Sequence, residues 1–131
     1  MLTEKEAMDI LNVILAELNK RNKHAVIAVA DAHGDLLAFL RMEKAKLSSI
    51  SIAMNKAYTA ARSQRTTSEM GRNARDPKTG FDMAYYGDPR FTGFGGGVPV
   101  KKDGKVIGAI AVSGLSQDED EEMAALGISV L

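Results

Sequence analysis

The chain has 131 residues, no cysteine, and equal numbers of basic (17) and acidic (17) side chains, so its formal net charge is zero. This composition excludes a disulfide framework and thiol chemistry, and it argues against a basic surface for nucleic acid. No apolar run approaches the roughly 18 residues that span a bilayer, and acidic residues stand where a signal peptide would be basic; we therefore expect a single cytoplasmic domain over residues 1–131, with no nucleic-acid or membrane partner.

The first third of the chain predicts a helix followed by a β-hairpin. Thr3 and Glu6 have the spacing of a capping box, and apolar residues then recur at intervals of three and four for about five turns. The β-prone runs 25–30 and 36–42 are separated by turn residues at 31–34. This pattern is typical of two antiparallel strands joined by a short loop.

A second helix is predicted from Ser48 or Ser49 onward, because an alanine-rich apolar stripe runs through residues 50–61. Lys56 lies at the edge of this stripe, and Arg41 ends the preceding strand. A cation in such a position can hold the carboxylate of a ligand, and arginine can do so through two parallel bonds. The alternative is that both side chains extend along apolar surface to reach water.

A long irregular segment follows at residues 71–90, after a capping-box spacing at 66–69 that predicts a short helix. A loop of this length within one domain is typical of a functional element. It carries Phe81, Tyr85 and Tyr86. These aromatic residues leave three interpretations open: a lid over a pocket, an arm that reaches another subunit, or packing on the chain's own surface.

The glycine-rich stretch 93–97 precedes a predicted hairpin, with strands at 98–100 and 106–112 and an Asp103-Gly104 turn. A dinucleotide fingerprint or a P-loop needs a helix after its glycines, and here a strand follows. The stretch is therefore interpreted as the start of a strand whose missing side chains leave room for a ligand or for another subunit.

A closing helix is predicted from the capping-box spacing of Ser116 and Glu119. The acidic run 118–122 is interpreted as charge that complements the start of this helix, rather than as a metal site. His33 is interpreted as a solvated turn residue, whereas His24 is either a polar residue at a strand edge or an iron ligand. No metal site is predicted, and no residue is assigned as a catalyst.

Several of these stretches together resemble the GlcG/HbpS family, which includes haem-binding HbpS and the C-terminal domain of PduO-type proteins. The resembling stretches are Ile27 to Asp31, Gly34, Leu36 to Phe39, Arg41-Met42, Lys56-Ala57, Thr59-Ala60, Gly95 to Pro99, Gly104, Ile107 to Ile110, Val112 to Gly114 and Gln117 to Glu119. They cover nearly the whole chain in order. The resemblance implies an α+β, profilin-like fold, with a five-stranded antiparallel sheet flanked by helices.

The resemblance also implies positions for a pocket or a subunit contact at the glycine-rich stretch, at Lys56 and near Ser113 and Asp118. With Arg41 added from the residue pattern, the predicted ligand-binding residues are Arg41, Lys56, Gly95, Gly96, Gly97, Ser113 and Asp118. His24 is the candidate haem ligand, although the family has no fixed motif for that ligand. Haem is the cofactor that the resemblance suggests.

The resulting functional hypothesis is an oligomeric small-ligand-binding protein that takes haem or another tetrapyrrole. One alternative is an accessory protein or enzyme acting on a small carboxylate or a diol-derived metabolite, as in glycolate or propanediol metabolism. A second alternative is a structural oligomer without a ligand. In each case we expect a homo-oligomer whose buried surface comes from the second helix and the glycine-rich strand.

Overall fold

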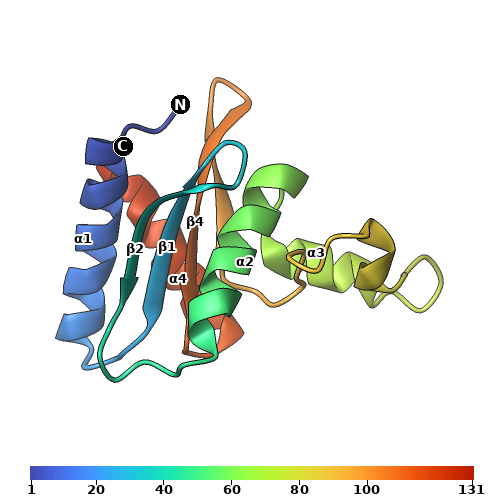
Figure 1. Ribbon diagram of the computed structural model, residues 1–131, viewed down its shortest axis with the longest axis horizontal. Coiled ribbons are helices and arrows are strands. Elements are labelled where there is room, and N and C mark those ends of the chain that lie inside the picture. The colour runs from blue at the N-terminus through green and yellow to red at the C-terminus, as the bar shows by residue number, and fades with distance from the viewer.

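An antiparallel sheet with helices on both faces forms the fold, which the computed structural model describes for all residues 1–131 (Figure 1). The elements are α1 (Glu4–Lys20), β1 (Val26–Asp31), β2 (Leu36–Arg41), α2 (Ser49–Ser63), α3 (Thr67–Ala74), η1 (Met83–Tyr86), β3 (Gly97–Lys102), β4 (Lys105–Ser113), α4 (Gln117–Leu126) and η2 (Gly127–Val130). The strand order is β2-β1-β4-β3, so β1 and β4 are central. None of the helices is both long and apolar enough to cross a membrane.

The helix starts follow from side-chain capping. At α1 the Thr3 hydroxyl accepts the Glu6 N–H, and the Glu6 carboxylate accepts the Thr3 N–H, so the predicted capping box is confirmed. At α3 and α4 only the hydroxyl half of the predicted box forms: the Thr66 hydroxyl accepts the Glu69 N–H and the Ser116 hydroxyl accepts the Glu119 N–H. At α2, by contrast, the N-cap residue Ser48 makes no side-chain capping bond. The first backbone N–H groups of α2 bond instead to the turn before the helix: Ser49 donates to the Lys46 carbonyl and Ile50 to the Leu47 carbonyl.

The sheet has four strands rather than the five implied by the resemblance. The chain before Gly97 does not extend β3, because Gly96 has φ 131° and its carbonyl takes a single bond from the Val112 N–H. The β3–β4 hairpin turns at Asp103 and Gly104, both with positive φ (52° and 75°), which confirms the predicted mirror-image turn. The predicted α+β class is thus confirmed, but the sheet has four strands instead of the five that the resemblance implied.

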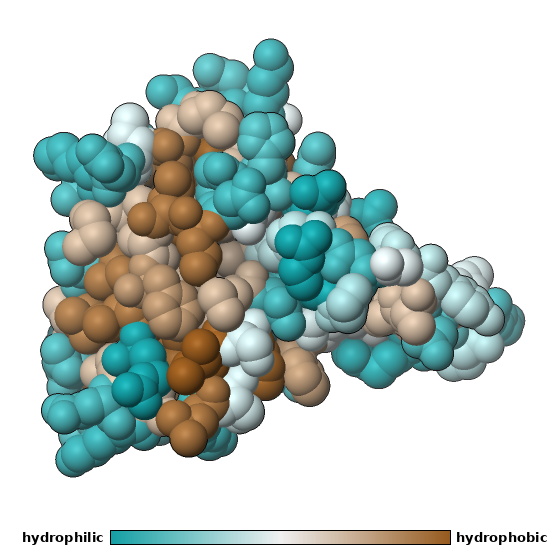
Figure 2. Space-filling view, in the orientation of Figure 1, coloured by the Kyte–Doolittle hydropathy of each residue, from teal (hydrophilic) through white to brown (hydrophobic).

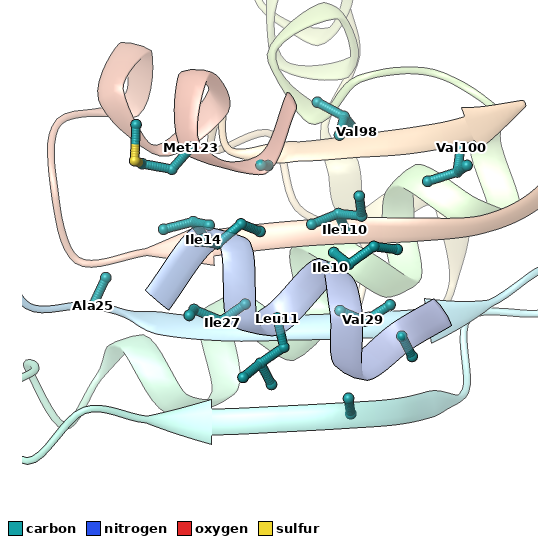
Figure 3. Packing of buried hydrophobic residues seen from close by; sticks show 14 of the residues in the cluster. Ile10, Leu11, Ile14, Ala25, Ile27, Val29, Val98, Val100, Ile110 and Met123 are labelled. Atoms are coloured by element: carbon teal, nitrogen blue, oxygen red, sulfur yellow. The ribbon is translucent and has the colours of Figure 1, made fainter. Parts of the chain in front are cut away.

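One face of the sheet is covered by α1 and α4 (Figure 3). Ile10 and Ile14 of α1 and Met123 of α4 pack there against Ile27 and Ile110 of the central strands. All five side chains are at most 1% exposed. Burying an aliphatic side chain of this size contributes about 1.5–3 kcal/mol, so this layer is the main core of the protein.

The other face is covered mainly by α2, and the contact of this helix with the sheet is lined with alanine. Ala53 and Ala57 of α2 pack against Ala28 and Ala111 of the central strands. Such small side chains allow the helix to lie close to the sheet. α2 packs mainly on β1, β3 and β4, and only Phe39 of the outer strand β2 packs against its alanine cluster. Figure 1 shows β2 beside the helix rather than beneath it.

The segment from α3 through η1 projects sideways from the sheet as an arm (Figure 1). It is joined to α2 by Tyr58, whose ring contacts Phe91 edge to face and whose hydroxyl donates to the Asp88 carboxylate. Arg90 also bonds Asp88 and lies 3.9 Å from the centre of the Tyr58 ring. Tyr85 in η1 stays 83% exposed. The aromatic segment thus packs partly on its own chain and partly faces solvent.

Candidate functional site

The predicted site residues come from one end of the sheet, where β1 begins and β2 and β4 end. The strand register sets Arg41, Val26 and Ser113 side by side, so their side chains share the sheet face that α2 covers. His24 precedes β1 at the same end, and its carbonyl oxygen lies beside Gly114. In Figure 1 this is the lower end of the sheet, where α2 and α4 also begin.

Lys56 of α2 is 2% exposed and lies against the end of β4. Its ammonium donates to the Val112 carbonyl and to the Asp120 carboxylate, each at 3.0 Å. The second carboxylate oxygen of Asp120 accepts the Leu115 N–H at 3.0 Å. One buried ion pair therefore ties α2 to the end of β4 and to the start of α4.

Burial acts on both members of this pair. It lowers the pKa of Lys56 and raises the pKa of Asp120, while their mutual attraction opposes each change. Removing one partner would leave an uncompensated buried charge, which typically costs about 3–5 kcal/mol. The pair is therefore a fixed structural element, and the Lys56 ammonium has only one of its three hydrogens left for another acceptor.

The glycine-rich stretch leaves space for the Lys56–Asp120 pair, because its residues have no side chain. A Cβ on Gly96 would lie 2.6 Å from both the Lys56 Nζ and the Val112 carbonyl oxygen. A Cβ on Gly97 would lie 2.6 Å from the Lys56 carbonyl oxygen and 2.8 Å from Thr67. The room beside these glycines is thus taken by α2, α3 and α4 of the same chain.

A pocket of about 220 Å³ opens beside the ion pair, between the start of α2 and the β4–α4 connection. Lys56 and Ser113, two of the predicted residues, line it together with Asp120. A second hollow of about 370 Å³ lies beyond Gln117, which lines both. Gly95 and Asp118 belong to that second hollow. The structure therefore distributes four of the seven predicted ligand-binding residues over two adjoining pockets.

Arg41 belongs to neither pocket, because it lies exposed on the outer strand. It belongs to a surface that we call the open face, which is formed by Leu36, Phe39 and Arg41 of β2 and by Ile50 of α2. The register places the three β2 residues opposite Ala30, Ala28 and Val26, on the α2 side of the sheet. Leu36 is 45% exposed and Phe39 and Ile50 are half-buried. Figure 2 shows apolar residues gathered over β1 and β2 beside α2.

The two histidines lie at opposite ends of β1. His24 is half-buried and its imidazole makes no hydrogen bond within the chain, whereas His33 is exposed in the β1–β2 turn. A strand of this length spans about 17 Å, so the two imidazoles of this chain lie too far apart to hold one iron together. No three His, Cys, Asp or Glu side chains are grouped so that they could hold a metal ion.

Two residues of the site were not singled out from the sequence. Asp120 was interpreted only as part of the acidic run, although it shares a helical register with buried Met123 and Ala124. Ser49 was considered only as a cap, yet it is 3% exposed and lines the first pocket. In both cases a polar residue in the register of a buried stripe was the available signal.

Comparisons with known proteins agree with the architecture. A family model described as haem degrading protein HbpS-like matches residues 2–129. Protein GlcG of Escherichia coli (strain K12) is 37% identical over 113 residues, which are 86% of this chain and 81% of that protein. A double mutant of Streptomyces reticuli HbpS has a structure with a TM-score of 0.87 and 32% identity, covering 99% of this chain and 86% of that one. The crystal structure of a PduOC:haem complex gives a TM-score of 0.92 and 25% identity, covering 99% and 94%.

Proposed function

This chain belongs to the HbpS-like family, and on that premise we propose that it is a small-ligand-binding protein whose ligand is haem or a related tetrapyrrole. Among its structural relatives, the PduOC chain was crystallised as a haem complex. The observation in this chain that carries the proposal is the open face, an apolar surface beside α2 on which Leu36 and Arg41 are exposed and Phe39 and Ile50 are half-buried.

The residues of the open face suit a flat apolar ring with acidic edges. Leu36, Phe39 and Ile50 offer apolar contact over a sheet surface, which a planar macrocycle can cover. Arg41 places a guanidinium at the rim, where it can pair with a propionate carboxylate. Haem, when bound, supplies an iron that proteins commonly hold through imidazole, and we assign that position to His24.

Lys56 and the glycines have a supporting part in this proposal. Their contacts fix how closely α2 lies against the sheet, and the position of α2 sets one wall of the open face. Ser113 and Asp118 line the two pockets at the same end of the sheet. We propose that these residues position the binding surface or receive polar groups beside it.

We also propose that the protein acts as a homo-oligomer. An exposed apolar surface next to an outer strand is typical of a surface that another subunit covers. A tetrapyrrole bound on the open face would then be enclosed between protomers, because one protomer supplies only one wall. The surface of α2 that borders the open face belongs to this predicted contact.

Titration with hemin tests the ligand. We expect a shifted Soret band that saturates at stoichiometric hemin, a changed band position in His24→Ala, and about ten-fold weaker binding in Arg41→Gln, because a charge-assisted bond contributes about 1.5–3 kcal/mol. His33→Ala is the matched control and should titrate like the parent protein. Absence of any Soret shift at stoichiometric concentration would exclude haem.

The two alternatives give different outcomes in solution. An accessory protein or enzyme acting on a small carboxylate or a diol-derived metabolite would bind or convert that molecule, and NMR of the mixture would detect this without added hemin. A structural oligomer without a ligand would respond to neither treatment. The hemin titration and the NMR measurement with these metabolites together therefore separate all three functions.

A further inference from the structure

The two outer strands of the sheet differ in what their free edges offer to a further strand. β2 and β3 stand at opposite ends of the strand order, so each has one edge without a neighbour. In an antiparallel ladder, residues alternate between those that bond the neighbouring strand and those whose N–H and C=O point away from it. The register therefore tells which backbone groups each outer edge presents.

The outer edge of β3 is closed to pairing. The Gly96 carbonyl accepts the Val112 N–H, and alternation from that pair leaves Gly97 and Pro99 pointing outward. The Gly97 N–H already donates to the Thr67 hydroxyl at 2.9 Å. Pro99 has no N–H to offer. A proline on an outer strand is a common protection against edge-to-edge association.

The outer edge of β2 is open. The Met42 N–H donates to the Ala25 carbonyl at 3.2 Å, and alternation from that pair leaves Phe39 and Arg41 pointing outward. No side chain or loop carbonyl of the chain accepts either of these N–H groups. β2 contains no proline, and its register is regular from residue 38 to residue 41.

Apolar side chains flank this edge on both faces of the sheet. Leu36 is exposed and Phe39 half-buried on the side of α2, whereas half-buried Leu40 packs against the core on the side of α1. Leu37 at the start of the strand is exposed as well. An outer strand that combines free backbone groups with apolar side chains is a template for another strand.

The charges around β2 suit a second copy of the same strand. Asp35 precedes the strand, and residues 41–46, at its end, carry three cations and one carboxylate. Asp35, Lys44 and Lys46 are exposed, and none of them forms an ion pair within the chain. Antiparallel pairing of two identical strands places the acidic start of each beside the basic end of the other. The strand is therefore complementary to itself.

We propose that β2 pairs antiparallel with β2 of a second copy, about a two-fold axis at Leu40, so that two four-stranded sheets form one sheet of eight strands. Phe39 of each copy then lies opposite Arg41 of the other, where a guanidinium can contact an aromatic ring. An axis at Arg41 would oppose two like charges, and an axis at Phe39 would draw the irregular Leu37 into the ladder. This inference rests on the proposed homo-oligomer and not on haem.

Hydrogen exchange at high and at low protein concentration tests the pairing in the parent protein, with mass spectrometry of the peptide over residues 36–42. Its outward amides should exchange about ten-fold more slowly in the concentrated sample, because they gain hydrogen bonds there. The peptide over residues 97–102 is the control and should not respond to concentration. An oligomeric sample without this protection of β2 would overturn the edge pairing alone, whereas a monomer in sedimentation would also remove the proposed homo-oligomer.

A single cysteine tests the register, because the chain has none of its own. In Leu40→Cys the two thiols face each other across the axis in a non-hydrogen-bonded pair, with Cα atoms about 4.5 Å apart, which suits a disulfide. Oxidised glutathione should therefore give a covalent dimer. Leu36→Cys is the control: its thiol is at least as exposed, but the two copies of this position lie about 27 Å apart and should stay unlinked. Equal or faster linkage of Leu36→Cys would refute the register, and the exchange measurement decides if Leu40→Cys fails to fold.

Discussion

At the scale of single residues, Gly96 decides whether the buried ammonium of Lys56 can be accommodated. Its φ of 131° is left-handed backbone that favours glycine, and the space where a Cβ would stand holds Lys56 Nζ and the Val112 carbonyl. These two atoms are themselves hydrogen-bonded to each other. A side chain at position 96 would therefore break the contact that joins α2 to β4.

We predict that Gly96→Ala destabilises the protein by about 3 kcal/mol or more, because it adds backbone strain to a collision with a buried ion pair. Urea unfolding followed by circular dichroism would measure the change. Gly104→Ala is the matched control, since Gly104 also has positive φ (75°) but has open space around it. That variant should cost only about 1 kcal/mol. Equal losses in the two variants would contradict the account of Gly96.

The sequence singled out one member of the buried pair, Lys56, but for a different role, and it did not single out Asp120. Lys56 was predicted to hold the carboxylate of a ligand, whereas in the structure the carboxylate that it holds belongs to Asp120. Asp120 lies 64 positions later, inside a run whose charge the helix start alone explains. Nothing local distinguishes Asp120 from its acidic neighbours except its register with Met123. Pairing over such a separation is fixed by the packing of α2 and α4 on one sheet.

At the scale of elements, the arm depends on a small charged clamp at its base. Arg90 donates two bonds from its side chain to Asp88, and the Tyr58 hydroxyl donates a third from α2. These donors hold the pKa of Asp88 well below its ordinary value of 3.8, the Arg90 bonds most strongly. A lowered carboxylate pKa stabilises the folded state fully above the unfolded pKa, and this stabilisation is lost as pH falls below it.

We predict that the arm loosens as pH falls from about 4 toward 2. Pepsin cleavage at the exposed aromatic residues Phe81 and Tyr85 should accelerate over this range, after normalisation to an unstructured peptide of the same sequence. Asp88→Asn should already be cut rapidly at pH 4, with a flatter pH dependence. Glu122→Gln is the control, since that carboxylate pairs with Arg21 between α1 and α4. A parent protein whose arm resists pepsin equally at both ends of the range would contradict the clamp.

Elements whose structure depends on residues close by in the sequence were predicted well. The cap of α1 and the Asp103-Gly104 turn depend on neighbours a few residues away, and the structure has both. The arm had no periodicity to interpret, because its fold depends on contacts such as Tyr58 with Phe91. The buried side of α2 also differs from the predicted stripe: it includes Ser49 and Lys56 and leaves Ile50 half-exposed.

At the scale of the whole molecule, the open face leaves apolar surface in contact with solvent. One side of the sheet is covered across its width by α1 and α4, whereas on the other α2 leaves Leu36 and Arg41 of β2 exposed and Phe39 only half-buried. A surface of this kind in a protein without net charge has little electrostatic repulsion to keep copies apart. Self-association would cover it.

We predict a homo-oligomer at micromolar concentration in sedimentation velocity. Phe39→Asp should shift the distribution toward smaller species, because it puts a charge into the apolar centre of the open face. Tyr85→Asp, at an exposed position of the arm, is the matched control and should sediment like the parent protein. A parent protein that sediments as a monomer would refute the assembly, and dissociation by Tyr85→Asp alone would assign the contact to the arm.

The family and the α+β class could be predicted from the sequence, since short stretches spread over the whole chain carried the resemblance. The two pockets and the open face could not. Each is a surface between elements, and its shape depends on how closely α2 approaches the sheet. That distance follows from alanine and glycine positions on several elements at once.

The strand order has a consequence for how the chain folds. β1 is central, yet one of its partners follows at once while the other, β4, is near the end of the chain. During synthesis α1 and the β1–β2 hairpin emerge with one edge of β1 unpaired. The sheet is completed only after β4 is made, and pairing between strands that lie far apart in the sequence forms slowly. Met1 and Leu131 border the same hollow. Joining the termini and opening the chain in the arm would make the β4–β1 pairing local, so such a permuted chain would reach the same sheet by a shorter search.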